Sequence, residues 1–471
     1  MKKQETTQNK RFIITLALFV IAFLLLAIRL VLFSTFESEK LAKNENNPRL
    51  AIDETLTQRG NVYEKNGKLV AYTKKDEKGI YRRIFPFGEV DAPITGYNSF
   101  LYGKTGLEET YNSELIGYDP KEKQTEIQKL AQREKLGNDV FLTLNQEAQD
   151  KAYNSLKGFK GSIVIMDPYT GEVKAMVSNP TFNPNDIEEK WNELSKNQDG
   201  IFLNRATQGT YRPGSIMKIV SADLIRSSGI NPIYNDRGYE RVGNFDITNY
   251  GYYHYGQIDL KRAFRWSVNT YFANKTMALG KQALENKTNK YMFNQKYDFD
   301  LKKSDVVIPY DELYDADLAM TSFGYGKTKV NPLHMAMVAS TIANNGNMMK
   351  PILVKNVKDK NGTIIKEKKP EVLSEVTDVN TANYVKDLMF DMVKQGTQSS
   401  YMAKNWGVAG KTGTVENAKG LNDDWFIGFA PANNPKFAFA VVVEDQERTG
   451  IEVISPMLGP LIGDLLSIKD L

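Results

Sequence analysis

The segment YRPGSIMKIVSADL, residues 211–224, decides how the rest of this chain is interpreted. The four residues before Ser215 are typical of a turn, and residues 216–224 place apolar side chains at helical spacing, so a helix is expected to begin at or near Ser215. Positions i and i+3 share one face of a helix, which brings the Lys218 amine within reach of the Ser215 hydroxyl. A lysine buried beside a serine can lose its proton and act as a base.

The Ser-x-x-Lys spacing is weak by itself. On the order of one or two such tetrads arise by chance in a chain of 471 residues. The segment is therefore also compatible with a surface serine beside a solvated lysine. Its catalytic interpretation depends on what other segments add.

A second segment, Ser267-Val268-Asn269, offers a hydroxyl and an amide two positions apart. On a loop facing Lys218, these groups would relay a proton and hold a substrate amide. The same pattern is common in helix caps, so it gains weight only in combination with the other motifs.

A third segment, Lys411-Thr412-Gly413-Thr414, precedes a stretch that is typical of a strand. On a strand edge it offers a fixed cation, hydroxyl groups and a glycine that lets substrate approach the backbone. The backbone N–H groups of Ser215 and Thr414 are then expected to form an oxyanion hole, where one donor is typically worth about 100- to 1,000-fold in rate.

The composition narrows the chemistry. The chain has no cysteine and only two histidines, His254 and His334, so no metal or other cofactor is expected and a cysteine nucleophile is excluded. Neither histidine lies in a context typical of a Ser-His-Asp triad, which makes lysine the expected base. A net charge of +4 gives no support to nucleic-acid binding.

The N-terminal region is typical of a membrane anchor. Residues 12–33 are almost wholly apolar, and about 20 apolar residues span a bilayer. Basic residues precede this run, so the positive-inside rule assigns residues 1–11 to the cytoplasm and the remainder of the chain to the outside. A cleaved signal peptide is the alternative, but no small-x-small cleavage pattern follows the apolar run.

Two folded units are expected after the anchor. Residues 34–137 contain short apolar stretches and an Asn66-Gly67 hairpin signal, which predict a stalk and a small, mostly β pedestal domain. Residues 138–471 predict an α+β (mixed α/β) domain in which helices flank a central antiparallel sheet. Its strands are expected at 140–144, 162–166, 172–177, 424–430 and 437–443, and helices at 145–156 and 456–468.

Ser-x-x-Lys, then Ser-x-Asn, then Lys-Thr-Gly, in this order, resembles the signature of penicillin-binding proteins and serine β-lactamases. The flanking residues are similar to those of class B penicillin-binding proteins, the monofunctional D,D-transpeptidases of peptidoglycan synthesis. The segments that carry this likeness are Arg205-Ala206, residues 211–215, residues 267–272 and residues 425–431, with Gln58-Arg59-Gly60 and Gly106-Leu107-Glu108 in the pedestal.

The resemblance implies a penicillin-binding, serine β-lactamase-like transpeptidase fold and a role for each motif. Ser215 would attack the carbonyl between the two terminal D-alanines of a stem peptide, and Lys218 would take its proton. Ser267 and Asn269 would shuttle protons and position the substrate.

The third motif and the partners follow from the same resemblance. Lys411, Thr412 and Thr414 would hold the terminal carboxylate, and Gly413 would leave room for it. The acyl group would pass to an amine on a neighbouring stem peptide, and β-lactams would acylate the same serine. Family members typically engage a polytopic membrane glycosyltransferase.

Three alternatives remain at this point. A β-lactamase or D,D-carboxypeptidase would use water as the acceptor, with Glu312 as the one carboxylate proposed to activate it. A penicillin sensor or silent scaffold of the cell-wall machinery is a second alternative. A bifunctional enzyme is disfavoured, because the region before residue 138 is too small for a glycosyltransferase.

Tyr325 stands where family members usually have glutamine.

Overall fold

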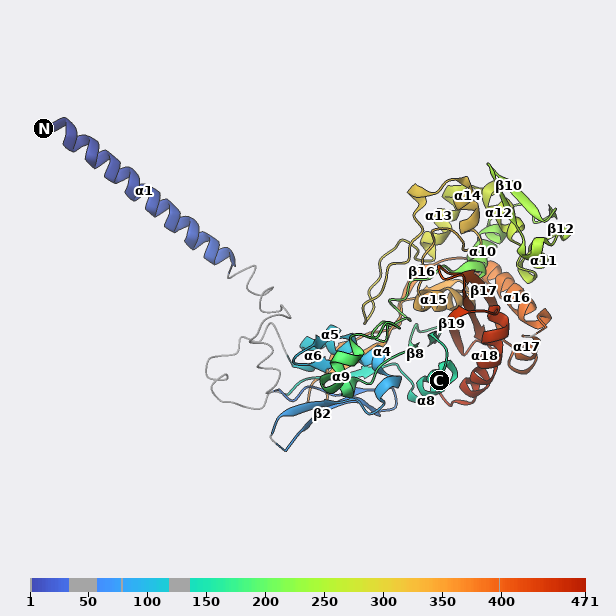
Figure 1. Ribbon diagram of the computed structural model, residues 1–471, viewed down its shortest axis with the longest axis horizontal. Coiled ribbons are helices and arrows are strands. Elements are labelled where there is room, and N and C mark those ends of the chain that lie inside the picture. Colours follow the sequence, from blue (N-terminus) through green and yellow to red (C-terminus); the bar gives the residue numbers. More distant parts are fainter. Residues whose placement is uncertain (1, 34–56, 78, 118–135, 398) are drawn as a thin grey trace.

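The computed structural model describes residues 2–33, 57–77, 79–117, 136–397 and 399–471. Helix α1 (Lys2–Leu32) stands apart from the folded domains in Figure 1. Its segment Phe12–Leu32 has 21 residues and a mean hydropathy of 2.8, and none of its residues is buried against the rest of the described protein. At 1.5 Å per residue this segment is about 30 Å long, which matches the hydrocarbon core of a bilayer. The predicted anchor segment is therefore a helix that is long and apolar enough to cross a membrane.

The pedestal is built on a six-stranded sheet with the order β15-β14-β6-β1-β2-β3. The Asn66-Gly67 turn joins β1 to β2 as predicted, with Gly67 at a φ of 85°. Strand β1 pairs in parallel with β6, so this sheet takes strands from both sides of residue 137. The strand expected at 140–144 therefore belongs to the pedestal sheet, and its assignment to the central sheet of the catalytic domain was wrong. Its strands are β1 (Val62–Tyr63), β2 (Leu69–Lys75), β3 (Tyr81–Ile84), β6 (Asp139–Leu142), β14 (Val354–Lys358) and β15 (Ile364–Glu367).

Short helices and a buried ion cluster complete the pedestal. The Glu108 carboxylate accepts hydrogen bonds from Arg59 and from Arg83, and all three side chains are almost fully buried. This cluster explains why Arg59 and Glu108 belong to the pedestal signature, since a buried charge needs a partner. The remaining elements are α4 (Ala92–Thr95), β4 (Asn98–Ser99), β5 (Gly103–Lys104), α5 (Gly106–Thr110) and α6 (Asn112–Leu115).

The catalytic domain contains the predicted central antiparallel sheet. Its five strands run in the order β17-β18-β19-β7-β8, and every neighbouring pair is antiparallel. Strand β17, which carries the Lys-Thr-Gly motif, lies at the edge as predicted. The strands are β7 (Gly161–Met166), β8 (Val173–Asn179), β17 (Ala409–Glu416), β18 (Asn422–Ala430) and β19 (Phe437–Gln446).

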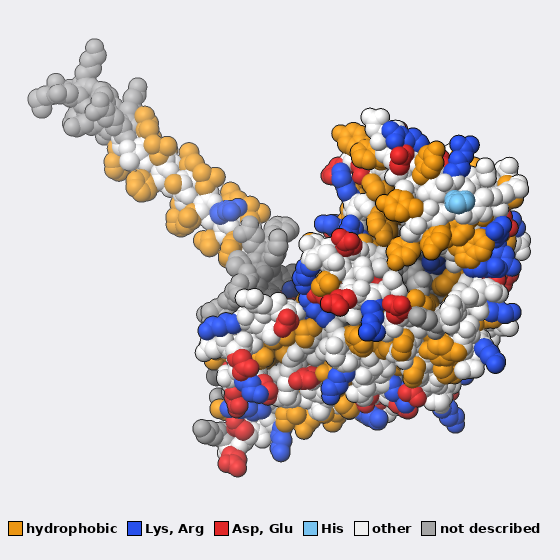
Figure 2. Space-filling view, turned by 45° about the vertical axis from the view of Figure 1, so that its right-hand side comes forward, with side chains coloured by type: hydrophobic (Ala, Val, Ile, Leu, Met, Phe, Trp, Pro, Cys, Tyr) orange, Lys and Arg blue, Asp and Glu red, His pale blue; other side chains and the backbone are white. Residues whose placement is uncertain are grey.

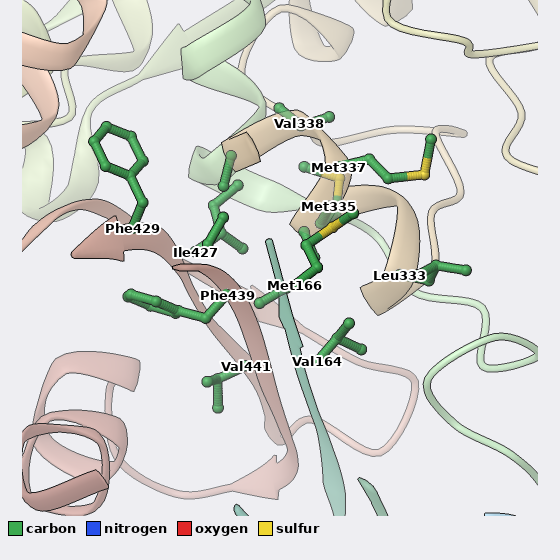
Figure 3. Packing of buried hydrophobic residues seen from close by; sticks show 14 of the residues in the cluster. Val164, Met166, Leu333, Met335, Met337, Val338, Ile427, Phe429, Phe439 and Val441 are labelled. Carbon is green, nitrogen blue, oxygen red and sulfur yellow. The ribbon is translucent and has the colours of Figure 1, made fainter. Parts of the chain in front are cut away.

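Helices cover both faces of this sheet. Helix α15 (Pro332–Ala343) is buried along its whole length and packs on β7, β18 and β19. Figure 3 shows Met335 of this helix close to Met166 of β7. Helices α8 (Gln146–Leu156) and α18 (Gly450–Ser467) pack on each other and on the sheet.

The closing helix α18 corrects one prediction. It begins at Gly450, and not at Pro456 as expected. Thr449 and Glu452 form a capping box that fixes the earlier start, while Pro456 and Pro460 lie inside the helix. A proline is a helix-start signal only in the first turn, so the expected boundary was wrong.

The remaining elements form a helical lobe beside the edge strand and connections around it, whereas α9 lies beside the pedestal helices (Figure 1). The helices are α9 (Ile187–Leu194), α10 (Lys218–Ser228), α11 (Leu260–Arg265), α12 (Asn269–Leu279), α13 (Lys281–Lys290), α14 (Asp315–Thr321), α16 (Val379–Gln395) and α17 (Ser400–Trp406). The short strands are β9 (Tyr234–Asp236), β10 (Tyr239–Val242), β11 (Phe245–Thr248), β12 (Gly256–Ile258), β13 (Asn347–Met349) and β16 (Val372–Glu375).

Candidate active site

Ser215 lies in a single 3-10 turn, Gly214–Met217, that leads directly into helix α10. The α-helix itself begins at Lys218, so the serine lies just before the helix. Gly214 has a φ of 57°, and a Cβ there would meet Val415 Cγ2 at 2.4 Å. Only glycine allows this turn to lie against the edge strand.

Lys218 is fully buried and its amine contacts four oxygen atoms. Its Nζ lies 3.0 Å from Ser215 Oγ and 2.9 Å from Ser267 Oγ. It also lies 2.7 Å from the Ser267 carbonyl oxygen and 2.6 Å from Asn269 Oδ1. Hydrogen bonds from one amine therefore join the first two motifs.

The environment of Lys218 favours its neutral form. Burial lowers the pKa of Lys218 well below its usual value, and the positive charge of Lys411 lowers it further. A neutral amine has two N–H donors and one lone pair. The Ser267 carbonyl and Asn269 Oδ1 can only accept hydrogen bonds, so they match the two donors. The lone pair is then available to a hydroxyl proton, and the Ser215 hydroxyl is within reach.

Ser267 adopts an unusual backbone conformation between α11 and α12. Its φ is 54°, in the left-handed region that a residue with a side chain rarely occupies. Such strain costs of order 1–3 kcal/mol and persists where surrounding contacts hold it. Asn269 opens α12, and its Nδ2 donates to the Thr248 carbonyl at 3.1 Å, which fixes the amide orientation.

Lys411 connects the third motif to the second. Its Nζ donates to Ser267 Oγ at 3.2 Å and to its neighbour's carbonyl, Thr412 O, at 3.1 Å. Burial lowers the pKa of Lys411 to about 7. The Ser267 hydroxyl thus lies between the amines of Lys218 and Lys411, and all three predicted segments meet at one place.

The edge strand lies directly against the serine turn. A Cβ on Gly413 would meet the Pro213 carbonyl oxygen at 2.9 Å and Ile216 N at 3.3 Å. Glycine was predicted to give substrate access to the backbone, but packing inside the protein already requires it here. Thr412 and Thr414 are half-buried on the same strand.

Sequence reasoning missed Asp424, the cross-strand partner of Thr414. Thr414 Oγ1 donates to Asp424 Oδ1 at 2.8 Å and accepts from Gly450 N at 3.3 Å. Burial raises the pKa of Asp424 to about 7. Tyr325, noted as a departure from the family pattern, donates to Thr414 O at 3.0 Å. The strand register would have revealed Asp424, whereas no local signal pointed to the Tyr325 contact.

A second missed cluster fixes the turn from behind. Glu444 Oε1 accepts from Arg205 Nε at 2.9 Å and from Tyr211 OH at 2.7 Å. Trp425 Nε1 donates to the Arg212 carbonyl at 3.1 Å. These contacts explain why residues flanking the three motifs carry part of the family signature.

Three other residues considered from sequence have contacts or surroundings that do not involve the three motifs. Glu312 is exposed, and its carboxylate lies 3.7 Å from Lys327 Nζ. His334 is buried against Phe293, where burial lowers its pKa to about 3, and His254 is exposed. The structure therefore supports lysine, not histidine, as the group next to the serine.

Comparison with known proteins agrees with this geometry. Residues 161–463 match the penicillin binding protein transpeptidase domain, and residues 59–140 match the penicillin binding protein A dimerisation domain. The peptidoglycan D,D-transpeptidase PbpA of Mycolicibacterium smegmatis is 30% identical over 92% of this chain and 93% of its own length.

Solved structures give the same result. A D,D-transpeptidase domain from Eggerthella lenta is 30% identical, with a TM-score of 0.78, and the match covers 87% of this chain and 99% of that one. Penicillin-binding protein A of Mycobacterium tuberculosis, solved as a ceftriaxone acyl-enzyme complex, has a TM-score of 0.81 at 28% identity, over 88% of this chain and 100% of that one.

The fold and the paired serine and lysine define a serine acyltransferase. More specifically, the chain belongs to the penicillin-binding protein transpeptidase family, and its two matched domains are those of the class B members.

Proposed function

We propose that this protein is a peptidoglycan D,D-transpeptidase that cross-links stem peptides through an acyl-enzyme on Ser215. The observation that carries the proposal is the 3.0 Å contact between the Ser215 hydroxyl and a fully buried lysine amine. A serine is a weak nucleophile until a neighbouring base takes its proton. The contact of Lys218 with Ser215 and the lowered pKa of its amine support this role for it.

Acylation proceeds by one attack and one departure. As Ser215 Oγ attacks the carbonyl carbon of the penultimate D-alanine, its proton passes to Lys218 Nζ. The N–H groups of Ser215 and Thr414 stabilise the oxyanion. The peptide C–N bond then breaks, and the leaving D-alanine nitrogen receives the proton from Lys218 through the Ser267 hydroxyl.

Transfer reverses these roles. An amine of a second stem peptide attacks the ester, its proton passes through the same groups to Ser215 Oγ, and the ester bond breaks. Before acylation, Lys411, Thr412 and Thr414 hold the terminal carboxylate of the donor peptide, which leaves with the released D-alanine. A lysine whose pKa is near 7 is charged when a carboxylate lies beside it, because an opposite charge favours the protonated form.

The cellular setting is part of the proposal. Residues 1–11 lie in the cytoplasm of a bacterium, α1 crosses the membrane once, and the pedestal and catalytic domain face the outside. The pedestal and anchor engage a polytopic membrane glycosyltransferase. β-Lactams acylate Ser215, as in the penicillin-binding protein A complexes with ceftriaxone, imipenem and penicillin G.

A donor peptide ending in D-Ala-D-Ala, incubated with the full chain in nanodiscs, tests the proposal. With an acceptor amine present, we expect released D-alanine to be matched by cross-linked peptide. Released D-alanine with only hydrolysed peptide would establish a carboxypeptidase instead. Glu312 lies exposed on the surface beside Lys327, which does not suit a group that activates water at Ser215. We therefore expect Glu312→Gln to leave the ratio of cross-linked to hydrolysed peptide unchanged.

A further inference from the structure

Exposed aromatic side chains are concentrated on one lobe of the catalytic domain. Outside the anchor, nine aromatic residues of the described chain are exposed, and six of them lie between residues 239 and 266. Tyr250 is 84% exposed, Tyr252 79% and Tyr253 64%. Figure 2 shows apolar side chains gathered on the upper lobe of the molecule, where Figure 1 places β10 and β12. Large exposed apolar patches mark binding sites more often than chance.

The loop that presents these tyrosines is held rigidly. Gly251 and Tyr252 both have positive φ, 62° and 57°, in the left-handed region of backbone conformation. Beneath them, the buried Asn249 donates to both carboxylate oxygens of Asp236 and to the Tyr253 carbonyl. Strain of this kind is retained where a conformation is needed. The tyrosines therefore form a fixed surface.

Hydrogen bonds connect the loop beneath this surface to the end of the second motif. Asn249 Oδ1 accepts from the backbone and hydroxyl of Thr270, the residue after Asn269. Asn269 itself donates to Thr248, the residue before Asn249. At the other side, Trp266 directly precedes Ser267 and stacks on Tyr255 with ring centroids 5.0 Å apart.

The charges of the lobe indicate a neutral ligand. Each of its four carboxylates already accepts hydrogen bonds: Asp236 from Asn249, Tyr255 N and Thr270, Glu240 from Tyr234 OH and Asn274, Asp246 from Arg241, and Asp259 from Arg262 N. No carboxylate of the described lobe is left for a cationic partner. Phenol rings, with apolar faces and polar edges, suit a ligand that is itself apolar on one face and hydroxylated at its rim.

We propose that the surface formed by Tyr239, Tyr250, Tyr252 and Tyr253 binds the glycan strand of the substrate. Pyranose rings present C–H faces that stack on aromatic rings and hydroxyl groups that bond to phenols. The inference rests on the proposed function, because a stem peptide reacting at Ser215 carries its sugar at the other end. An extended peptide covers about 3.3–3.6 Å per residue, so a few residues lead from the active site onto the neighbouring lobe.

The position of the lobe argues against lipid as the occupant. Figure 1 places β10 and β12 at the end of the folded domains that lies away from the pedestal and α1. Because the pedestal follows α1 in the chain, we expect this end to lie farther from a membrane than the pedestal does.

Binding of peptide-free glycan strands to the full chain in nanodiscs tests the inference. The test variant combines Tyr250→Ala, Tyr252→Asn and Tyr253→Ala, because asparagine tolerates the positive φ. Phe100→Ala, at an exposed aromatic residue of the pedestal, is the matched control. We expect at least tenfold weaker glycan binding for the triple variant and no change for the control. The KM of a glycan-linked donor should rise in the triple variant, while the KM of the free donor peptide stays constant.

Penicillin labelling of Ser215 in the same samples separates the two proposals. If penicillin labels the protein but glycan affinity is equal in wild type and triple variant, or if wild type binds no glycan, the inference fails while the transpeptidase assignment stands. A dimer that forms without glycan and is lost in the triple variant would also overturn it, since the surface would then bind a second copy. Failure of labelling itself would instead overturn the proposed function.

Discussion

Replacing Lys218 by methionine separates the base from the fold. Methionine keeps the length of the side chain but removes the amine, so the Ser267 carbonyl and Asn269 Oδ1 lose their donor. A buried acceptor left unpaired costs about 1–3 kcal/mol. The gain from burying an apolar side chain in place of an amine offsets part of this loss. We therefore expect a modest decrease in the free energy of unfolding and a native circular dichroism spectrum.

The expected effect on rate is much larger. A positioned general base typically contributes about 100- to 10,000-fold, which is about 2.7–5.5 kcal/mol of activation free energy. Since Lys218 Nζ is the amine 3.0 Å from Ser215 Oγ, acylation by a fluorescent penicillin should fall by that factor. Stopped-flow fluorescence measures this rate directly.

Lys275→Met provides the matched control. Lys275 is also buried on α12, and its amine donates to the Ile233 carbonyl at 2.8 Å, outside the catalytic cluster. This variant should lose comparable stability and keep its acylation rate. Near-normal acylation in Lys218→Met, or an equal loss in Lys275→Met, would refute the assignment of Lys218 as the base.

Three further predictions follow from the same site. Burial and the Lys411 charge lower the pKa of Lys218, so the rate of acylation should rise with pH and level off well below pH 10.5. Stopped-flow measurements over a pH series test this, and a rise in rate centred near pH 10.5 would contradict it. Gly413→Ala should reduce acylation about 10- to 100-fold with the fold intact, because its Cβ would meet a backbone oxygen of the serine turn at 2.9 Å and displace the nucleophile. Above its pKa of about 7 Asp424 carries a negative charge beside Thr414, whose hydroxyl donates to it, so the threonine proton is held away from the substrate carboxylate and the KM of a carboxylate donor should rise above pH 7. Asp424→Asn should lessen that rise, and an identical KM profile would show that Asp424 has no part in it.

Local sequence patterns were enough to predict most of the catalytic sheet. Strands near 162–166 and 437–443 have apolar runs bounded by turn signals, and they form the central pair β7 and β19. The helix after Asn145 was also confirmed, since the Asn145 side chain caps it by accepting from Ala148 N. These elements depend on short-range periodicity and capping, which a single sequence displays.

Features that depend on long-range pairing were not predictable in the same way. Strand β14 lies far from β6 in the sequence, inside the catalytic domain, and still pairs with β6 in the pedestal sheet. The convergence of Ser215, Ser267 and Lys411 was expected from the family resemblance alone, because no periodicity connects segments so far apart. The positive φ of Ser267 and the Asp424 contact appear only when the chain is folded.

The most direct test of the central claim is intact-mass spectrometry of the full chain after exposure to penicillin G, followed by peptide mapping. The structure predicts one long-lived adduct on the peptide that contains Ser215, and no adduct in Ser215→Ala. An adduct on another residue, or labelling that persists in Ser215→Ala, would contradict the claim that the Lys218 amine activates this serine.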